Sequence, residues 1–217
     1  MHYLSGDNES RMPHSESRIE PHAARFPTFE LALPEWVESF VPPADHVYAT
    51  PQERMQLAIG LSRQNIEQGT GGPFGAAVFD LDTGRLVAPG VNVVVSSGWS
   101  GAHGEMVAYA IAQQIVGSHD LGAKGLARHE LVTSCEPCSM CFGATPWAGI
   151  KRLVCGATEA DAWAIGFDEG PKPANWVQAL QVRGIEVVEG VLQHDAAQVL
   201  RDYGTRGGAI YNGRLGQ

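Results

Sequence analysis

Two short stretches, His103-Gly104-Glu105 and Pro137-Cys138-Ser139-Met140-Cys141, decide the fold and chemistry expected of this chain of 217 residues. Each stretch begins a predicted helix that follows a strand or a loop. Cys138 and Cys141 are three positions apart, so a helix places both on one face of its first turn. The free N–H groups and the dipole of that turn favour thiolates, the form of cysteine that binds metal. The second stretch is therefore expected to offer two metal ligands.

His103 adds an imidazole to the two thiolates, and this combination suits Zn²⁺. Three protein ligands leave the fourth tetrahedral position to water, as catalytic zinc sites do. Glu105 stands two residues beyond His103, where its carboxylate can lie beside the metal without binding it and can transfer protons. We therefore predict one catalytic zinc per chain, bound by His103, Cys138 and Cys141.

A closed structural zinc site and a redox cysteine pair are the alternatives. Cys135 is the candidate for a fourth protein ligand, but it falls at a strand end rather than on the helical turn, which favours a buried role. A redox pair would not account for His103 and Glu105. The remaining cysteine and histidines of the main domain lack ligand-like spacing: Cys155, expected in the core, and His119, His129 and His194.

The rest of the chain alternates between helical and strand patterns. A capping box at Thr50–Glu53 opens a helix that Gly69 ends. The later elements are predicted as strands at 74–79, 86–95, 130–134, 152–155 and 185–192, and as helices at 103–116, 137–149 and 195–203. Pro146 is expected to shorten or kink the second of these helices. This alternation predicts an α/β fold with a mixed sheet of about five strands and helices on both faces.

Three segments are expected along the chain. Residues 1–45 are rich in Pro, Ser, His and Glu without a sustained period, which is typical of an arm that is partly disordered or docked. Residues 46–205 contain all the periodic elements and form the predicted catalytic domain. Residues 206–217 remain as a C-terminal tail.

The charge balance argues against a nucleic-acid partner. Asp and Glu number 24 against 15 Lys and Arg, which gives a net charge of −9 with histidine neutral. Nucleic-acid affinity comes largely from the neutralisation of phosphates by Lys and Arg. We therefore expect a small-molecule substrate and no nucleic acid.

The cysteines and the N-terminal residues predict a cytoplasmic location. The first ten residues have neither the basic start nor the apolar stretch of a signal peptide. No window approaches the roughly 18 apolar residues of a membrane span. Crowded cysteines without a secretory signal are typical of metal or redox chemistry in a reducing compartment. We expect no association with a membrane.

These motifs give the sequence a clear family resemblance. His-x-Glu followed by Pro-Cys-x-x-Cys is the signature of zinc deaminases, and the sequence resembles the cytidine/deoxycytidylate deaminase superfamily. Gly166-Phe167-Asp168-Glu169 is most similar to the bacterial guanine deaminase branch. Gly104 departs from the alanine usual between the motif His and Glu, and it should leave metal binding intact. The other matching stretches are Gly72–Val78, Gly90–Asn92, Thr133–Ala144 and Trp147.

The resemblance implies a cytidine deaminase-like three-layer α-β-α fold with a mixed five-stranded sheet. It also implies roles for individual residues. The zinc ligands would be His103, Cys138 and Cys141, and Glu105 would shuttle protons. Glu169, with Asp168 as the alternative, would meet the amino or N–H edge of a base. The remaining substrate-binding positions would be Phe74, Asn92, Trp147, Phe167 and, in a tail that closes the pocket, Tyr211.

The implied reaction is hydrolytic deamination of a free purine-type base. Guanine, converted to xanthine and ammonia, is the leading substrate, and amino-s-triazines such as ammeline present a similar edge. Guanosine, cytosine or cytidine, and tRNA adenosine are the alternative substrates, and a non-catalytic zinc-stabilised interaction domain is the alternative to an enzyme. Family members are commonly homodimers, so a homodimer is expected.

Overall fold

The structure, a computed structural model, describes residues 26–213. The first 25 residues of the predicted arm lie outside the described residues. Residues 31–213 belong to one compact unit, and residues 26–30 belong to another. The segment from Leu31 contains α1, Trp36–Phe40, in which Val37 is buried in the core. Part of the predicted arm, from Leu31 onward, therefore packs on the main domain.

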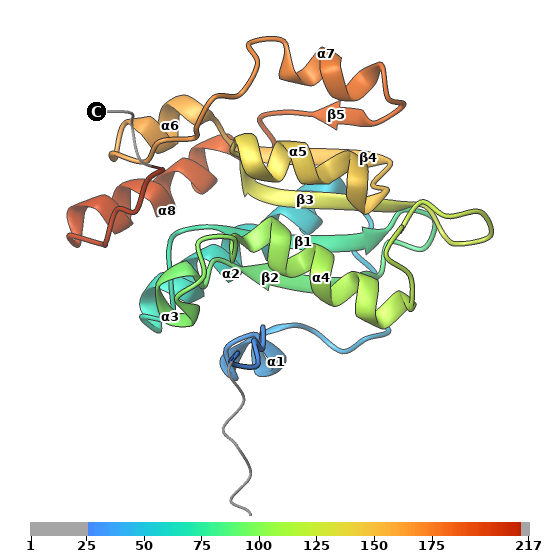
Figure 1. Ribbon diagram of the computed structural model, residues 1–217, viewed down its shortest axis with the longest axis horizontal. Coiled ribbons are helices and arrows are strands. Elements are labelled where there is room, and N and C mark those ends of the chain that lie inside the picture. The colour runs from blue at the N-terminus through green and yellow to red at the C-terminus, as the bar shows by residue number, and fades with distance from the viewer. Residues whose placement is uncertain (1–25, 214–217) are drawn as a thin grey trace, which may run out of the picture. The chain divides into compact units, whose positions relative to one another are not determined.

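A mixed sheet of five strands forms the centre of this unit (Figure 1). The strands are β1 (Gly75–Asp80), β2 (Leu86–Val91), β3 (His129–Cys135), β4 (Arg152–Ala157) and β5 (Glu186–Val188). Their order across the sheet is β2-β1-β3-β4-β5. β1 pairs antiparallel with both β2 and β3, whereas β4 is parallel to β3 and β5 is parallel to β4. The predicted fold class is confirmed.

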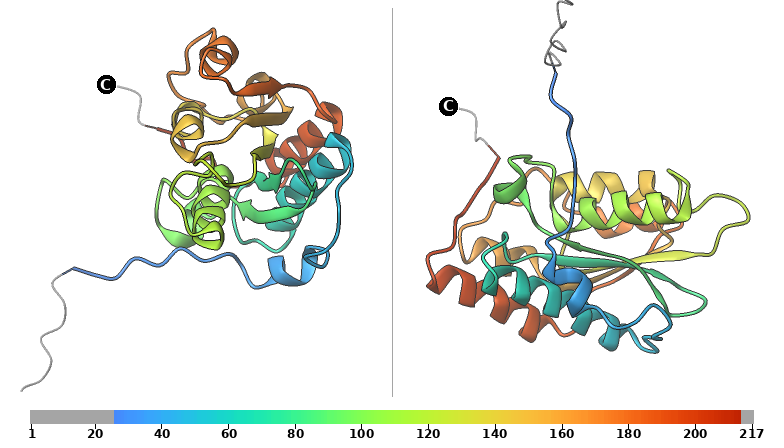
Figure 2. Two further views of the ribbon diagram at one scale, coloured as in Figure 1. Left: turned by 90° about the vertical axis from the view of Figure 1, so that its right-hand side faces the viewer. Right: turned by 90° about the horizontal axis from the view of Figure 1, so that it is seen from below.

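Helices cover both faces of the sheet, as Figure 2 shows. On one face lie α2 (Pro51–Glu67) and α8 (Gln193–Thr205), and on the other lie α4 (Gly104–Val116), α5 (Ser139–Ala148) and α7 (Trp176–Gln181). Alternate strand residues point to opposite faces. Ala77 and Val132 pack on the α2 side, whereas Val78 and Leu131 pack on the α4 side. No helix among residues 26–213 combines the length and apolar character of a membrane span.

The helix boundaries follow the local signals that the sequence carries. The capping box of Thr50 and Glu53 is formed at the start of α2. Gly117 and Gly149 end α4 and α5 in the left-handed conformation, with φ of 71° and 80°. Pro146 lies in the last turn of α5, and the helix continues past it to Ala148.

Two predicted strands are shorter than expected. β2 ends at Val91 because the Asn92 side chain accepts a hydrogen bond from the backbone N–H of Val94 at 3.3 Å. This turn leads into α3, Val94–Ser97. β5 ends at Val188 because the chain turns at Gly190 and Leu192, both of which have positive φ. A further short helix, α6 (Glu159–Trp163), has a capping box made by Thr158 and Asp161.

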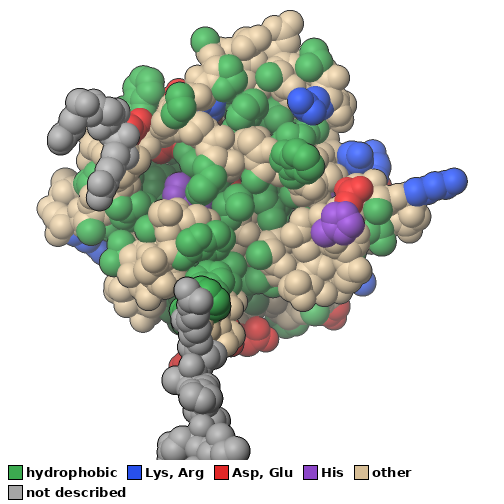
Figure 3. All heavy atoms as spheres, in the orientation of Figure 1, with side chains coloured by type: hydrophobic (Ala, Val, Ile, Leu, Met, Phe, Trp, Pro, Cys, Tyr) green, Lys and Arg blue, Asp and Glu red, His purple; other side chains and the backbone are tan. Residues whose placement is uncertain are grey.

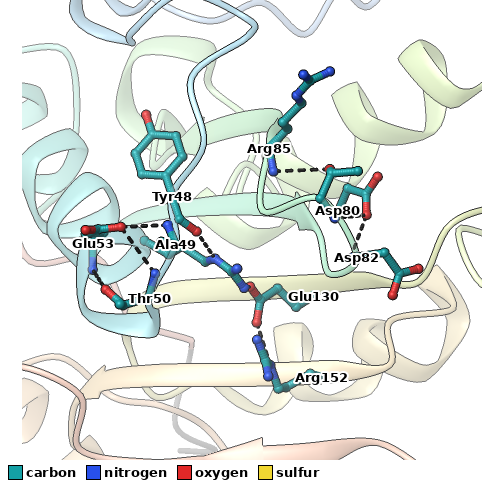
Figure 4. Close-up of polar contacts among 11 residues, drawn as sticks. Tyr48, Ala49, Thr50, Glu53, Asp80, Asp82, Arg85, Glu130 and Arg152 are labelled. Carbon is teal, nitrogen blue, oxygen red and sulfur yellow. Dashed lines mark hydrogen bonds and ion pairs between the residues drawn. The ribbon is translucent and has the colours of Figure 1, made fainter.

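A buried ionic network joins α2 to the sheet (Figure 4). Glu130 on β3 is fully buried, and its carboxylate pairs with Arg54 of α2. Its second oxygen lies 2.6 Å from Nε of Arg152 on β4. Arg54 also donates to the carbonyl oxygen of Tyr48 at 3.0 Å. Buried charges are tolerated when they are paired and hydrogen-bonded, so this network fixes how α2 sits on the sheet.

Glu130→Gln is expected to lower the free energy of unfolding by about 3 kcal/mol, because it leaves the two arginines without their shared counter-charge. The control is Asp82→Asn, which breaks the exposed pair with Arg128 and is expected to cost less than about 1 kcal/mol. Denaturant unfolding of both variants measures the difference. Equal losses would contradict a dominant role for the buried network.

Candidate active site

The N-terminal ends of α4 and α5 meet at one end of the sheet. His103 is the residue immediately before α4, and Cys138 is the residue immediately before α5. Both have extended backbone conformations, with ψ of 155° and 172°. The side chains therefore project from the helix ends and meet in front of them.

These two side chains and Cys141 form a group with metal-ligand geometry. Nδ1 of His103 lies 3.4 Å from Sγ of Cys138 and 3.6 Å from Sγ of Cys141. All the ligand atoms lie within 4.8 Å of one another. Ligand atoms of a tetrahedral zinc site, with bonds of about 2.0 to 2.3 Å, are about 3.6 Å apart. The donor set and its spacing fit zinc.

Cys135 does not belong to this group. It is buried at the end of β3, and its sulfur lies 3.6 Å from the carbonyl oxygen of Thr158. The first hydrogen-bonded turn of α5 begins after Cys135, so its side chain follows the strand rather than the helix. The three-ligand group thus leaves a coordination position for water.

The pKa values of the two thiols in this group shift in opposite directions. The hydrogen bond from Cys141, together with the histidine, lowers the pKa of Cys138 to about 4 despite burial. The same hydrogen bond and burial raise the pKa of Cys141 well above its ordinary value. Burial lowers the pKa of His103, but the hydrogen bond and charge of Cys138 outweigh it and raise that pKa. A bound metal cation would displace the remaining thiol proton.

Two buried carboxyl groups face the same space. Glu105, the second residue of α4, is 6% exposed, and burial followed by the charge of Cys138 raises its pKa. Glu169 is also 6% exposed, and burial followed by the charges of Cys138 and Glu105 raises its pKa to about 8. The neighbouring Asp168 is exposed and accepts from the backbone N–H of Gly170. Of the two acidic candidates in this loop, Glu169 is the buried one.

His103, Cys138 and both buried carboxyl groups line one cavity. Its aromatic walls are Phe74, Phe167 and Tyr211, with the rings of Phe74 and Phe167 4.9 Å apart and those of Phe167 and Tyr211 5.3 Å apart. The Tyr211 hydroxyl is buried without a hydrogen-bond partner among residues 26–213. The full lining is Phe74, Asn92, His103, Glu105, Glu136, Cys138, Phe167, Asp168, Glu169 and Tyr211.

Hydrogen bonds join the C-terminal tail to the loop that contains Glu169, beside this cavity. The Asp168 N–H donates to the Asn212 side chain at 2.8 Å, and that side chain donates to the Gly166 carbonyl at 2.9 Å. Tyr203 donates to the Ala209 carbonyl at 2.8 Å. These bonds place the tail residue Tyr211 in the cavity of its own chain. Outside them lies a wider hollow that shares His103, Cys138, Asp168, Glu169 and Tyr211 with the cavity.

The structure corrects the prediction for Trp147. Its side chain is 85% exposed and does not line the cavity. Trp147 stands nine residues after Cys138 on α5, which is half a turn out of phase at 3.6 residues per turn. The helix therefore directs Trp147 away from the metal ligands.

Glu136 is a cavity residue that the sequence interpretation missed. It precedes Pro137 and Cys138, and its carboxylate accepts from the backbone N–H of Glu159 at 3.2 Å. Its other partner is Lys172, whose Nζ lies 3.5 Å from the same oxygen. Its place directly before the Pro-Cys-x-x-Cys motif is the sequence feature that could have predicted its position in the cavity.

Comparisons with known proteins agree with this geometry. The profile of the family described as "Cytidine and deoxycytidylate deaminase zinc-binding region" matches residues 49–157. The guanine deaminase of Bacillus subtilis (strain 168) is 36% identical over 115 residues, which are 53% of this chain and 69% of that protein.

Solved structures give the same result over most of the chain. A guanine deaminase from Nitrosomonas europaea superposes with a TM-score of 0.78 and 46% identity, covering 82% of this chain and 97% of that one. A structure in complex with 2,6-diaminopurine has a TM-score of 0.78 and 48% identity, covering 84% and 96%. The fold and the metal-ligand group define a zinc-dependent hydrolytic deaminase. The chain belongs to the cytidine and deoxycytidylate deaminase family.

Zinc content should distinguish ligands from bystanders. Cys138→Ala and Cys141→Ala are each expected to lose most of the metal, because two protein ligands hold zinc far more weakly than three. Cys135→Ala, the matched control, is expected to keep about one zinc per chain. Metal analysis of the purified variants tests this. Loss of zinc from the Cys135 variant alone would overturn the ligand set.

The stability of the zinc-free protein should depend on the ionisation of Glu169. Because folding raises the pKa of this group from 4.5 to about 8, folding favours its neutral form. The stabilisation is complete below pH 4.5 and is lost as the pH rises through about 8. The stability of Glu169→Gln relative to the wild type should therefore increase as the pH rises from about 5 to about 8.

Thermal or denaturant unfolding of the chelator-treated proteins measures this difference across the pH range. Glu186→Gln, at an exposed position on β5, is the control and should follow the wild-type pH dependence. Parallel curves for the wild type and the Glu169 variant would contradict the burial of an ionisable group at this position.

Proposed function

We propose that this protein deaminates free guanine, which gives xanthine and ammonia. The observation that carries the proposal is one cavity that combines the metal-ligand group, two buried carboxyl groups and three aromatic walls. A planar, neutral purine fits aromatic walls, and its N–H donors fit a carboxylate acceptor. Relatives that are guanine deaminases, at 36% and 46% identity, support the same substrate.

We assign the metal to His103, Cys138 and Cys141. Zinc bound by these residues would supply Lewis acidity and would lower the pKa of a bound water to near neutrality. His103 and Cys138 line the cavity together with Glu105 and Glu169, so the metal would lie beside both carboxyl groups.

Glu105 is the proton carrier in this proposal. Its burial beside the ligand group raises its pKa, so it accepts a proton more readily than an exposed glutamate does. The water oxygen bonds to the amino-bearing ring carbon, and Glu105 takes one proton of this water and passes it to the amino nitrogen. The C–N bond then breaks, ammonia departs, and the hydroxyl left on the ring carbon tautomerises to the carbonyl of xanthine.

Glu169 and the aromatic residues orient the substrate. The Glu169 carboxylate accepts from the amino or N–H edge of the base, and Phe74 and Phe167 contact its faces. Asn92 is 1% exposed, and its carbonyl oxygen is engaged by the Val94 N–H, which leaves its amide nitrogen to donate to a ring acceptor. The unpartnered hydroxyl of Tyr211 offers a further polar contact.

Guanosine is the second candidate substrate, because the cavity continues into the wider hollow where a ribose could extend. A tRNA substrate has less support. On the face shown in Figure 3, Lys and Arg side chains lie toward the edges, and hydrophobic side chains occupy the middle. This distribution and the net charge of −9 provide few positive charges to bind the phosphates of a tRNA.

A cytoplasmic location is supported by the cysteines. All four are free thiols, and two of them belong to the metal-ligand group. A reducing compartment keeps such thiols available for metal. Assembly as a homodimer stays a prediction from the family resemblance.

Ammonia release from guanine, guanosine, ammeline, cytosine, cytidine and adenosine tests the function. Guanine is expected to give the highest kcat/KM. Glu105→Gln should reduce kcat on guanine about 100-fold or more while keeping its zinc, because the amide cannot carry the proton. Full activity in this variant would refute the assignment of Glu105, and absence of guanine turnover by the wild type would refute the proposed substrate.

A further inference from the structure

Lys172 is a buried ammonium group beside the cavity. Its side chain is only 2% exposed. Nζ lies 3.1 Å from the carbonyl oxygen of Pro137, 3.5 Å from the carboxylate of Glu136 and 3.8 Å from that of Glu159. It also lies 4.8 Å from the ring centroid of Trp176. Burying an ammonium group costs several kcal/mol unless such partners surround it. These contacts therefore fix where the Lys172 side chain lies.

The contacts of Lys172 join two segments that both line the cavity. Pro137 immediately precedes the metal-ligand candidate Cys138, and Lys172 follows Glu169 by three residues. A second link lies nearby, because the Ser139 N–H donates to the Glu169 carbonyl at 2.8 Å. The loop with Glu169 is therefore fastened to the start of α5 at two neighbouring points.

The position of Lys172 in the chain makes it specific to this loop, because it lies three residues after Glu169 and contacts the residue before Cys138. Neither of the other two lysines of the chain, the exposed Lys124 and Lys151, lines the cavity or the wider hollow.

We propose that Lys172 is the positioning residue for Glu169: its contacts with the start of α5 hold the loop that carries Glu169 beside the metal-ligand group, where the Glu169 carboxylate meets the donor edge of the base. The inference rests on the proposed function, because it assumes that Glu169 reads that edge. Lys172 itself does not line the cavity, so it acts through Glu169 rather than on the substrate.

The test compares two ligands that differ in the donor edge. 8-Azaguanine keeps the amino and N–H groups of guanine, whereas purine lacks its exocyclic groups. In Lys172→Met, binding of 8-azaguanine to the zinc-loaded protein should weaken about tenfold or more, with a similar loss of kcat/KM on guanine. Binding of purine should change less than about threefold. Lys124→Met is the matched control and should equal the wild type.

Double variants show whether the effect passes through Glu169. In the Glu169→Gln background, adding Lys172→Met should cost less than about threefold further, because the acceptor is already gone. Equal weakening of both ligands, or full additivity of the two substitutions, would overturn the proposal. Unchanged behaviour of the Lys172 variant would overturn it too.

Lys172→Met leaves the partly buried carboxylate of Glu136 without a counter-charge and can destabilise the protein for that reason. The pair Glu136→Gln with Lys172→Met removes both charges and relieves that cost, and it should show the same ligand selectivity. Wild-type selectivity in this pair would refute the inference.

The Glu169→Gln variant separates this inference from the proposed function. If Glu169→Gln is impaired on guanine and the Lys172 variants are not, only the role of Lys172 fails. If Glu169→Gln is unimpaired, the assignment of Glu169 in the proposed function fails as well.

Discussion

The meeting of three ligand atoms from two helices is the constraint on which this structure depends. β2 and β3 both run antiparallel to β1, so they run in the same direction and end at the same edge of the sheet. The helices that follow them, α4 and α5, therefore begin at that edge and on the same face. β4 is parallel to β3, so the segment leading to Glu169 leaves from this edge too. The strand order thus gathers groups from distant parts of the sequence.

The strand order also places several buried acidic groups close to one another. Glu105, Glu169 and the Cys138 thiolate share one small cavity, and each carboxyl group has a raised pKa. A divalent cation relieves this repulsion, which couples metal binding to the protonation of the site and to folding. Lys172 contributes positive charge of the protein itself near Glu169.

The parts of the site that the sequence predicted are those fixed by local geometry. His103, Glu105, Cys138 and Cys141 lie within the first turn of a helix, where spacing in the sequence determines spacing in space. Trp147 lies beyond that turn, where the helical phase of α5 directs its side chain away from the metal ligands and into solvent. The pair of Glu136 and Lys172 spans 36 residues and depends on how the loop after β4 returns to α5, which no local pattern encodes.

The acidic character of the chain is also found in the lining of the cavity. Among the described residues, no Lys or Arg lines the cavity or the wider hollow outside it, whereas Asp168 and Glu169 line both. A phosphate group on the substrate would meet these carboxylates, and no Lys or Arg of the lining would offset its charge. A neutral base or nucleoside avoids this repulsion, and its N–H donors gain from the same carboxylates. The lining therefore favours a neutral base or nucleoside over a nucleotide, through the same carboxylates that we propose bind the base.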